Sequence, residues 1–247
     1  MNLKGKSVLV TGGSIGIGLE LAKQFIIEGS HVMVCARNKA PLEQAKKECP
    51  ALEIAQCDVT DPSQVERLLS LAKKKMGGVD VLLNNAAVFR RFDMLEDYPL
   101  EKQIEEVQIN FEGPIIVSNV FLDELVSKPE AMIVNFTSPA AHMPMAASIV
   151  YSATKAAIRS WTISLRHQLR TTSVRVVELN PPAVDTRMNE NNPGTADMKL
   201  MSPIRFAEIA IKGLKRGKEE ILVGQAKPFK GLSRMFPGLA FKMVNKA

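Results

Sequence analysis

One stretch near the N-terminus decides the fold of this chain: Ser7-Val8-Leu9-Val10-Thr11-Gly12-Gly13-Ser14-Ile15-Gly16-Ile17-Gly18. Its first five residues form the apolar run of a buried strand, and residues 16–28 have the apolar spacing of a helix. Glycines at such a junction let backbone N–H groups approach a pyrophosphate. The stretch therefore predicts a βα unit with a dinucleotide-binding turn. A tight turn with close helix packing is the alternative.

Apolar runs of strand length alternate with helical segments along the rest of the chain. Strands that are buried on both faces have this continuous apolar character. We therefore predict the α/β class: one Rossmann-like, doubly wound, seven-stranded parallel sheet with helices on both faces, in a single domain over residues 1–225. The expected strands are 7–11, 31–36, 52–57, 79–84, 131–137, 174–179 and 220–223. The expected helices are 16–28, 41–48, 62–76, 100–127 with an interruption at Gly113-Pro114, 150–170 and 203–216.

Composition excludes several classes of protein. The 247 residues are 46% hydrophobic and 23% charged, which is typical of a globular domain. The longest apolar runs are far shorter than the roughly 20 residues of a membrane span, and the N-terminus lacks a signal-peptide pattern. We therefore expect a cytoplasmic protein. The three cysteines and three histidines are scattered, so we expect reduced thiols and no metal.

Residues 226–247 form a basic, amphipathic C-terminal tail. They hold five bases and no acid, so the net charge of +6 leaves only +1 for residues 1–225. That near-neutral body argues against nucleic-acid binding. Pro228 and Pro237 prevent one continuous helix in the tail. We favour packing of its apolar residues on a neighbouring subunit, as in a homodimer or homotetramer. Weak peripheral contact with a membrane surface and a disordered tail stay open.

The second expected strand ends with Cys35-Ala36-Arg37. Proteins that use NAD usually carry an acid near this point to bind the ribose 2′-hydroxyl, and this chain has none. A guanidinium suits a 2′-phosphate instead. The sequence thus predicts NADP(H) as the cofactor, with a solvated surface arginine as the ordinary alternative.

Tyr151 and Lys155 lie four residues apart, on one face of an expected helix. A phenol with a pKa of about 10 is a poor acid–base group near neutrality. A nearby cation favours the phenolate and draws that pKa toward the working range. The pair therefore predicts a general acid/base.

Further polar residues follow the strands in order: Asn84-Asn85-Ala86, Asn110 and Ser138. Each alone fits a turn, a surface position or the start of a loop. With the Gly-rich turn, Asp58 and the segment from Pro181 to Thr186, however, their order and spacing resemble the short-chain dehydrogenase/reductase family. The resemblance extends from Lys4 to Val223 and is strongest to its DltE-type oxidoreductases.

The resemblance implies a role for each of these residues. Tyr151 would donate the proton in carbonyl reduction, Lys155 would lower its pKa and hold the nicotinamide ribose, and Ser138 would orient the substrate oxygen. Asn110 would support a water-linked proton relay. Asp58 would meet the adenine, and Val184 and Thr186 the carboxamide. The full cofactor-binding set is Gly12, Ser14, Ile15, Gly16, Ile17, Gly18, Arg37, Asp58, Val59, Asn84, Ala86, Tyr151, Lys155, Val184 and Thr186.

Three positions depart from the family pattern. Ala87 and Pro182 stand where glycine is usual, and Pro139 directly follows Ser138 and removes a backbone donor. None of these changes removes a reacting group. The expected function is therefore an NADP(H)-dependent oxidoreductase that interconverts a carbonyl and a secondary alcohol. An NADP(H)-binding sensor and a membrane-peripheral scaffold are the alternatives. Residues 89–92, 142–145 and 187–201 are expected over the substrate, which the sequence does not identify.

Overall fold

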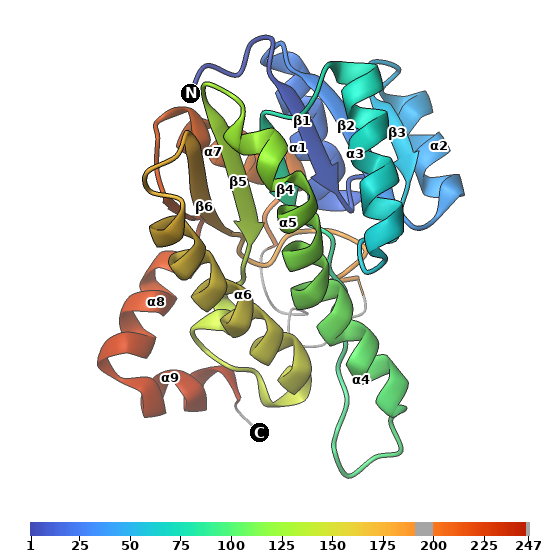
Figure 1. Cartoon of the computed structure of the whole chain (residues 1–247). Coiled ribbons are helices and arrows are strands. Elements are labelled where there is room, and N and C mark those ends of the chain that lie inside the picture. Colours follow the sequence, from blue (N-terminus) through green and yellow to red (C-terminus); the bar gives the residue numbers. More distant parts are fainter. Residues whose placement is uncertain (191–199, 246–247) are drawn as a thin grey trace.

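A parallel sheet forms the centre of the computed structural model, which describes residues 1–190 and 200–245 (Figure 1). Seven strands lie in the order β3-β2-β1-β4-β5-β6-β7, and all neighbours are parallel. The predicted doubly wound sheet is confirmed. The order reverses beside β1, which is where this fold type binds ligands. The strands are β1 (Ser7–Thr11), β2 (His31–Ala36), β3 (Glu53–Gln56), β4 (Val81–Asn84), β5 (Ala131–Phe136), β6 (Val174–Asn180) and β7 (Glu220–Leu222).

Helices cover both faces of the sheet. One face packs on α1, α2 and α7, and the other on α3, α5 and α6. Their bounds are α1 (Gly16–Ile27), α2 (Lys39–Glu48), α3 (Pro62–Met76), α4 (Leu100–Val107), α5 (Gly113–Val126), α6 (Ile149–Gln168) and α7 (Pro203–Lys215). The shorter helical turns are η1 (Gln108–Glu112), η2 (Pro139–Ala141) and η3 (Ala146–Ser148).

The predicted interruption at Gly113-Pro114 is wrong. Helix α4 continues through the π-helical turn η1 directly into α5. The Gly113 N–H donates to the Gln108 carbonyl, five residues earlier, so the helix widens just before the proline. Because proline has no N–H to donate, a regular α-helix would lose a hydrogen bond here, and the widened turn lets the helix continue without it. The other predicted bounds agree with the observed ones to within two residues.

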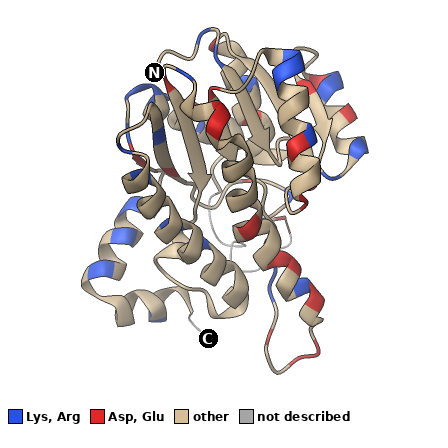
Figure 2. Cartoon of the chain, viewed as in Figure 1, with Lys and Arg blue, Asp and Glu red and all other residues tan. Residues whose placement is uncertain are grey.

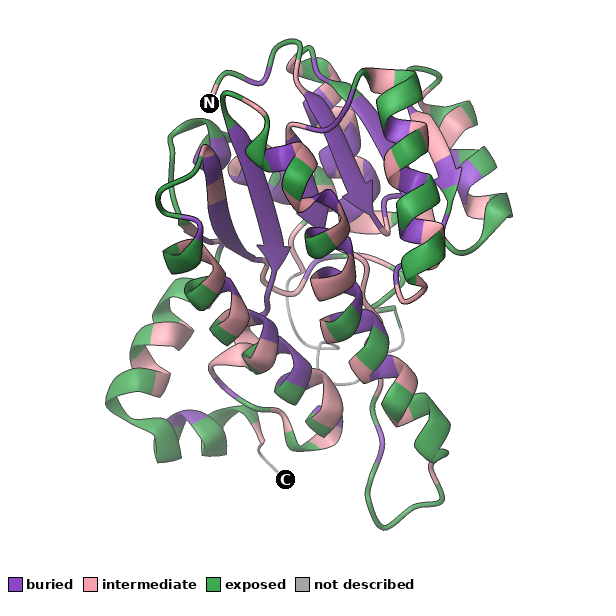
Figure 3. Cartoon of the chain, viewed as in Figure 1, coloured by how far each residue is buried: buried purple, intermediate pink, exposed green. Residues whose placement is uncertain are grey.

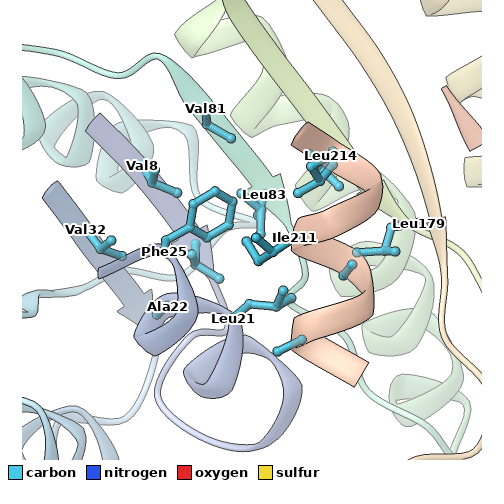
Figure 4. Packing of buried hydrophobic residues seen from close by; sticks show 14 of the residues in the cluster. Val8, Leu21, Ala22, Phe25, Val32, Val81, Leu83, Leu179, Ile211 and Leu214 are labelled. Carbon is cyan, nitrogen blue, oxygen red and sulfur yellow. The ribbon is translucent and has the colours of Figure 1, made fainter. Parts of the chain in front are cut away.

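Two apolar cores hold the layers together. Every residue of β1, β4 and β5 is buried, as Figure 3 shows by colour. Phe25 of α1 is fully buried and lies in the core between the sheet and α7, with Val8, Leu83 and Ile211 (Figure 4). This core fixes α1, and therefore the Gly-rich turn before it, against the sheet.

The C-terminal tail folds as two short helices, α8 (Ala226–Met235) and α9 (Pro237–Val244). As predicted, the tail is not one continuous helix, and the break lies at Pro237, which starts α9. Pro228 does not interrupt α8, because it lies in the first turn, where its missing N–H is tolerated. Asn245 accepts a hydrogen bond from the Ala146 N–H at 2.6 Å and donates to the Pro144 carbonyl at 2.9 Å. Within the described residues, no helix is long and apolar enough to cross a membrane.

Phe25→Ala should lower the free energy of unfolding by about 3–5 kcal/mol, because it leaves a cavity in a closely packed core. Urea unfolding followed by circular dichroism measures the loss. Ile27→Ala is the matched control on the same helix, since the Ile27 side chain is 74% exposed. The control should change stability by no more than about 0.5 kcal/mol. Equal losses in the two variants would contradict this account of the core.

Candidate active site

The Gly-rich turn between β1 and α1 brings backbone very close to the segment that follows β4. A side chain at Gly12 would place its Cβ 2.7 Å from Ala86 Cα, and Gly12 has a φ of +62°. A Cβ at Gly18 would lie 2.5 Å from the Asn85 side-chain nitrogen. Glycine is required at both positions. Without side chains at these positions, the backbone of the turn can pack directly against the segment that follows β4.

Thr11 and Asn85 fasten this turn to the end of β4. The Thr11 hydroxyl donates to the Leu83 carbonyl at 3.2 Å and accepts from the N–H groups of Asn85 and Ala86. The Asn85 amide donates to the carbonyls of Thr11 and Gly12 at 2.9 and 3.0 Å. Asn85 was not among the predicted site residues, because an asparagine at a strand end is also an ordinary turn former.

A cavity of about 300 Å³ opens at the carboxyl ends of β1, β2 and β4. Besides Asn85, its wall includes Ala36, Asn38, Ala87, Val88, Ile109, Arg187 and Met188, which the predicted site set lacks. Eleven residues of the predicted cofactor-binding set line it. They are Gly12, Ser14, Ile15, Gly16, Ile17, Gly18, Arg37, Asp58, Val59, Ala86 and Thr186.

Two predicted cofactor residues lie behind the cavity wall. The buried Asn84 amide donates to the Ser118 hydroxyl at 2.9 Å and to the Asn135 side-chain oxygen at 2.8 Å. Val184 is also buried, and its backbone pairs with Met201. Asn84 thus links β4 to α5 and β5, and Val184 shapes the segment that carries Thr186.

Arg37 lies at the rim of the cavity in an ion pair. Its Nη1 is 3.0 Å from the Glu105 carboxylate of α4, which also pairs with Arg90 at 2.6 Å and Lys102 at 3.3 Å. Arg37, followed by Lys102 and Arg90, holds the pKa of Glu105 below its usual value. Across the same cavity, Asp58 accepts from the backbone and hydroxyl of Thr60.

Ser138, Tyr151 and Lys155 come together beyond β5. Ser138 caps η2, where its hydroxyl accepts from the Ala140 N–H at 3.2 Å, and it hydrogen-bonds the Tyr151 phenol. Lys155 follows one turn later on α6. Its buried ammonium lies 5.5 Å from the Tyr151 ring centroid and donates to the Phe136 carbonyl at 3.0 Å. Sequence spacing thus identified three groups that the fold assembles.

The pKa of the Tyr151 phenol is raised, whereas the sequence predicts that Lys155 lowers it. Burial raises the pKa of Tyr151 to about 12; the Ser138 hydrogen bond opposes the rise and the charge of Glu106 adds to it. Burial also lowers the pKa of Lys155 to about 8, against the charge of Glu106. Desolvation is the largest effect on the phenol, and the predicted downward pull by Lys155 is not among the causes that act on its pKa.

Asn110 lies on the π-helical turn and connects the cavity to these groups. Its side chain accepts from the Val88 N–H at 2.8 Å, donates to the Val88 carbonyl at 2.9 Å and reaches the Thr154 hydroxyl at 3.3 Å. Phe89, which follows Val88 in the chain, packs edge-on against the Tyr151 ring with ring centroids 4.8 Å apart. One buried amide thus fixes both the cavity wall at Val88 and a neighbour of the phenol.

A family model for short chain dehydrogenase matches residues 6–196. The chain belongs to the short-chain dehydrogenase family. It is 38% identical over 248 residues to "Uncharacterized oxidoreductase DltE" of Bacillus subtilis (strain 168), with 99% of this chain and 98% of the relative covered. An uncharacterized oxidoreductase of Staphylococcus aureus (strain USA300) is 28% identical over 219 residues, or 87% of this chain and 94% of that relative. These similarities confirm the predicted family and its DltE-like character.

Solved structures share the whole fold. A short-chain dehydrogenase from Burkholderia cenocepacia in complex with NADP has a TM-score of 0.88 and 25% identity, with both chains fully covered. A second, from Burkholderia phymatum in complex with NAD, has a TM-score of 0.85 and 22% identity over 95% of this chain and 93% of that one. Short-chain dehydrogenases thus bind a nicotinamide dinucleotide, and the two complexes contain different ones.

The residues of this short-chain dehydrogenase fit such a cofactor. The Gly-rich turn forms one part of the cavity wall, and Arg37 and Asp58 form another. Among the described residues, no three His, Cys, Asp or Glu side chains gather as a metal site would require. The cavity is therefore suited to a dinucleotide that approaches backbone amides at one end and polar side chains at the other.

The segments expected over the substrate have mixed placements. Phe89 contacts Tyr151, as described above, whereas Phe92 is buried and stacks on Tyr98 with ring centroids 4.6 Å apart. Met143 is buried as well, so it packs rather than lines an open site. Residues 191–199 of the third segment lie outside the described residues.

Glu106 is a buried group that the sequence analysis missed. It lies one turn before Asn110, is wholly inaccessible to solvent and accepts a hydrogen bond from the Arg90 N–H at 3.2 Å. Burial raises its pKa to about 7, while Arg90 and Lys155 act in the opposite direction. Its spacing from Asn110 is the one available signal, because residues four apart share a helix face.

Proposed function

We propose that this short-chain dehydrogenase is an NADP(H)-dependent oxidoreductase that interconverts a carbonyl and a secondary alcohol, with Tyr151 as general acid/base. The observation that carries this proposal is the convergence of Ser138, Tyr151 and Lys155, which Asn110 connects to the cavity wall at Val88. A small carbonyl or alcohol compound is the substrate class that these groups suit. A binding-only sensor would not need an acid–base pair.

The reaction divides between the cofactor and the side chains. When bound, the nicotinamide supplies or accepts the hydride. The Ser138 hydroxyl donates a hydrogen bond to the substrate oxygen, and Tyr151 Oη delivers a proton to that oxygen in reduction or takes it in oxidation. Lys155 holds the nicotinamide ribose, and its positive charge stabilises the phenolate that forms in reduction. Asn110 holds the adjoining loop and supports the return of the proton.

Preference for NADP(H) is supported by Arg37. Its guanidinium lies on the cavity wall and its side chain is 44% exposed, so it can turn from Glu105 to a phosphate. The residues that follow β2 are Arg37, Asn38 and Lys39, so no carboxylate lies there to bind a ribose 2′-hydroxyl. The relative in complex with NADP is consistent with this proposal.

We predict that NADPH binds about ten- to a hundredfold more tightly than NADH, because a charge-assisted hydrogen bond from Arg37 contributes about 1.5–3 kcal/mol. Arg37→Ala should remove most of this preference, as fluorescence titration with each dinucleotide measures. Lys47→Ala is the control, since it removes an exposed charge from α2 outside the cavity. If Arg37→Ala leaves the ratio of the two dissociation constants unchanged, the assignment of NADP(H) through Arg37 is wrong.

Tyr151→Phe should lower NADPH-dependent turnover by about 10²–10⁴, because it removes the proton donor. Affinity for NADPH should be retained. The activity is first sought with a panel of ketones, aldehydes and 3-oxo acids by loss of NADPH absorbance. Tyr98→Phe is the matched control, since it removes the hydroxyl of the one other tyrosine, which stacks on Phe92. Full activity in Tyr151→Phe would refute the mechanism.

We also propose that the protein is cytoplasmic and forms a homodimer or homotetramer in which the tail contacts a neighbouring subunit. Helices α8 and α9 carry basic side chains without an acid (Figure 2). Their exposed apolar residues are Met235, Phe236, Leu239, Phe241, Met243 and Val244. Such a patch is characteristic of an interaction surface. Weak contact with an anionic membrane is the second candidate, supported by the same bases.

Phe236→Glu with Leu239→Glu should reduce the mass of the assembly in light scattering, because two charges would be buried at the contact. The cofactor site should still form, since both residues are on the tail surface. Ile27→Glu, an exposed apolar residue on α1, is the control and should leave the mass unchanged. An unchanged mass in the tail variant, together with lost sedimentation on anionic liposomes, would favour membrane contact over subunit packing.

A further inference from the structure

Glu106 occupies an unusual position for a carboxylate. None of its surface is exposed, and its Oε2 atom has no hydrogen-bond partner within the described part of the chain. The Arg90 guanidinium forms its ion pair with Glu105, so its charge acts on Glu106 without a contact ion pair. A buried carboxylate is costly unless a charge of opposite sign acts on it. The location of that charge therefore indicates what Glu106 does.

Two cations act on Glu106: Arg90 first, and then Lys155 on α6, the helix that packs against α4. The Lys155 side chain is itself buried, and its ammonium donates a hydrogen bond to the neutral Phe136 carbonyl. Among the described residues, Glu106 is the carboxylate whose charge acts on both Lys155 and Tyr151. The two charges form no contact ion pair, so they act on each other through the low-dielectric interior.

We propose that Glu106 is a positioning residue, the buried counter-charge that keeps protons on Lys155 and Tyr151 as the pH rises and so holds the pair ready to donate. This role rests on the proposed function for its catalytic consequence, but not for the electrostatic coupling itself. The facing groups are the Arg90 backbone and guanidinium from the loop after β4, and Lys155 and Tyr151 from α6. On its own helix, the neighbouring carboxylate Glu105 is directed to Arg37 and Arg90.

The sign of the effect follows from the charges. Ionised Glu106 favours the protonated forms of Lys155 and Tyr151, so it raises the pKa of each. The pKa of Glu106 itself is about 7, so its charge is lost below that pH and present above it. Carbonyl reduction by wild-type protein and by a variant without this charge should therefore agree at acid pH and diverge above neutrality.

Glu106→Gln is the main test, because the amide oxygen can still accept from the Arg90 N–H while the charge is gone. We expect kcat for reduction within about threefold of wild type at pH 6, and an alkaline limb displaced to lower pH by roughly 0.5–1 pH unit. Glu106→Asp, which retains the charge, should restore the wild-type profile. Glu101→Gln removes an exposed charge from the first turn of α4 and should leave the profile unchanged. A Glu106→Gln profile that is scaled down equally at every pH would show a structural role instead.

Carbonyl ¹³C NMR of glutamate-labelled protein tests the coupling without turnover. One carboxyl signal that is absent from Glu106→Gln should titrate near pH 7 in the wild type. In Lys155→Met its midpoint should rise, because coupling between two sites is reciprocal. An unchanged midpoint overturns the proposal. If the midpoint rises while no carbonyl substrate is reduced, the coupling stands and the proposed oxidoreductase activity fails.

Discussion

The site depends on the attachment of the Gly-rich turn to the end of β4. Thr11 and Asn85 make this attachment with side-chain hydrogen bonds to backbone, and Gly12 and Gly18 allow the close approach. Because β1 and β4 are central neighbours in a parallel sheet, the loops that follow them meet at one edge. The cradle for the cofactor and the wall that leads to the reacting groups are therefore a single structure.

Much of the fold could be predicted because parallel strands that are buried on both faces appear in the sequence as continuous apolar runs. The runs around Val8, Val34 and Ile133 are apolar on both faces. The glycines at 12, 16 and 18 follow the first of these runs and indicate a tight strand–helix turn. The catalytic groups were identifiable for a different reason. Ser138 and Tyr151 follow one another at family spacing, although only the folded chain brings their hydroxyls together.

The features that could not be predicted depend on which residues of a helix face the protein interior. Gly113-Pro114 resembles a helix break, yet packing of a continuous helix favours a π-helical turn there instead. Glu105 and Glu106 are identical in sequence terms, but one pairs with cations at the cavity rim and the other is buried. Local composition cannot distinguish them, because the inward-facing member is fixed only by how α4 packs on α6.

The orientation of α4 also links the dinucleotide cavity to the groups around Tyr151. Asn110 and Glu106 lie one turn apart and hold Val88 and Arg90, the residues on either side of Phe89. Val88 forms part of the dinucleotide cavity, and Phe89 packs against the Tyr151 ring. A change in the register of α4 would therefore move the cavity wall, the neighbour of the phenol and the counter-charge of Lys155 together. The π-helical turn sets that register, which a regular helix through Pro114 would alter.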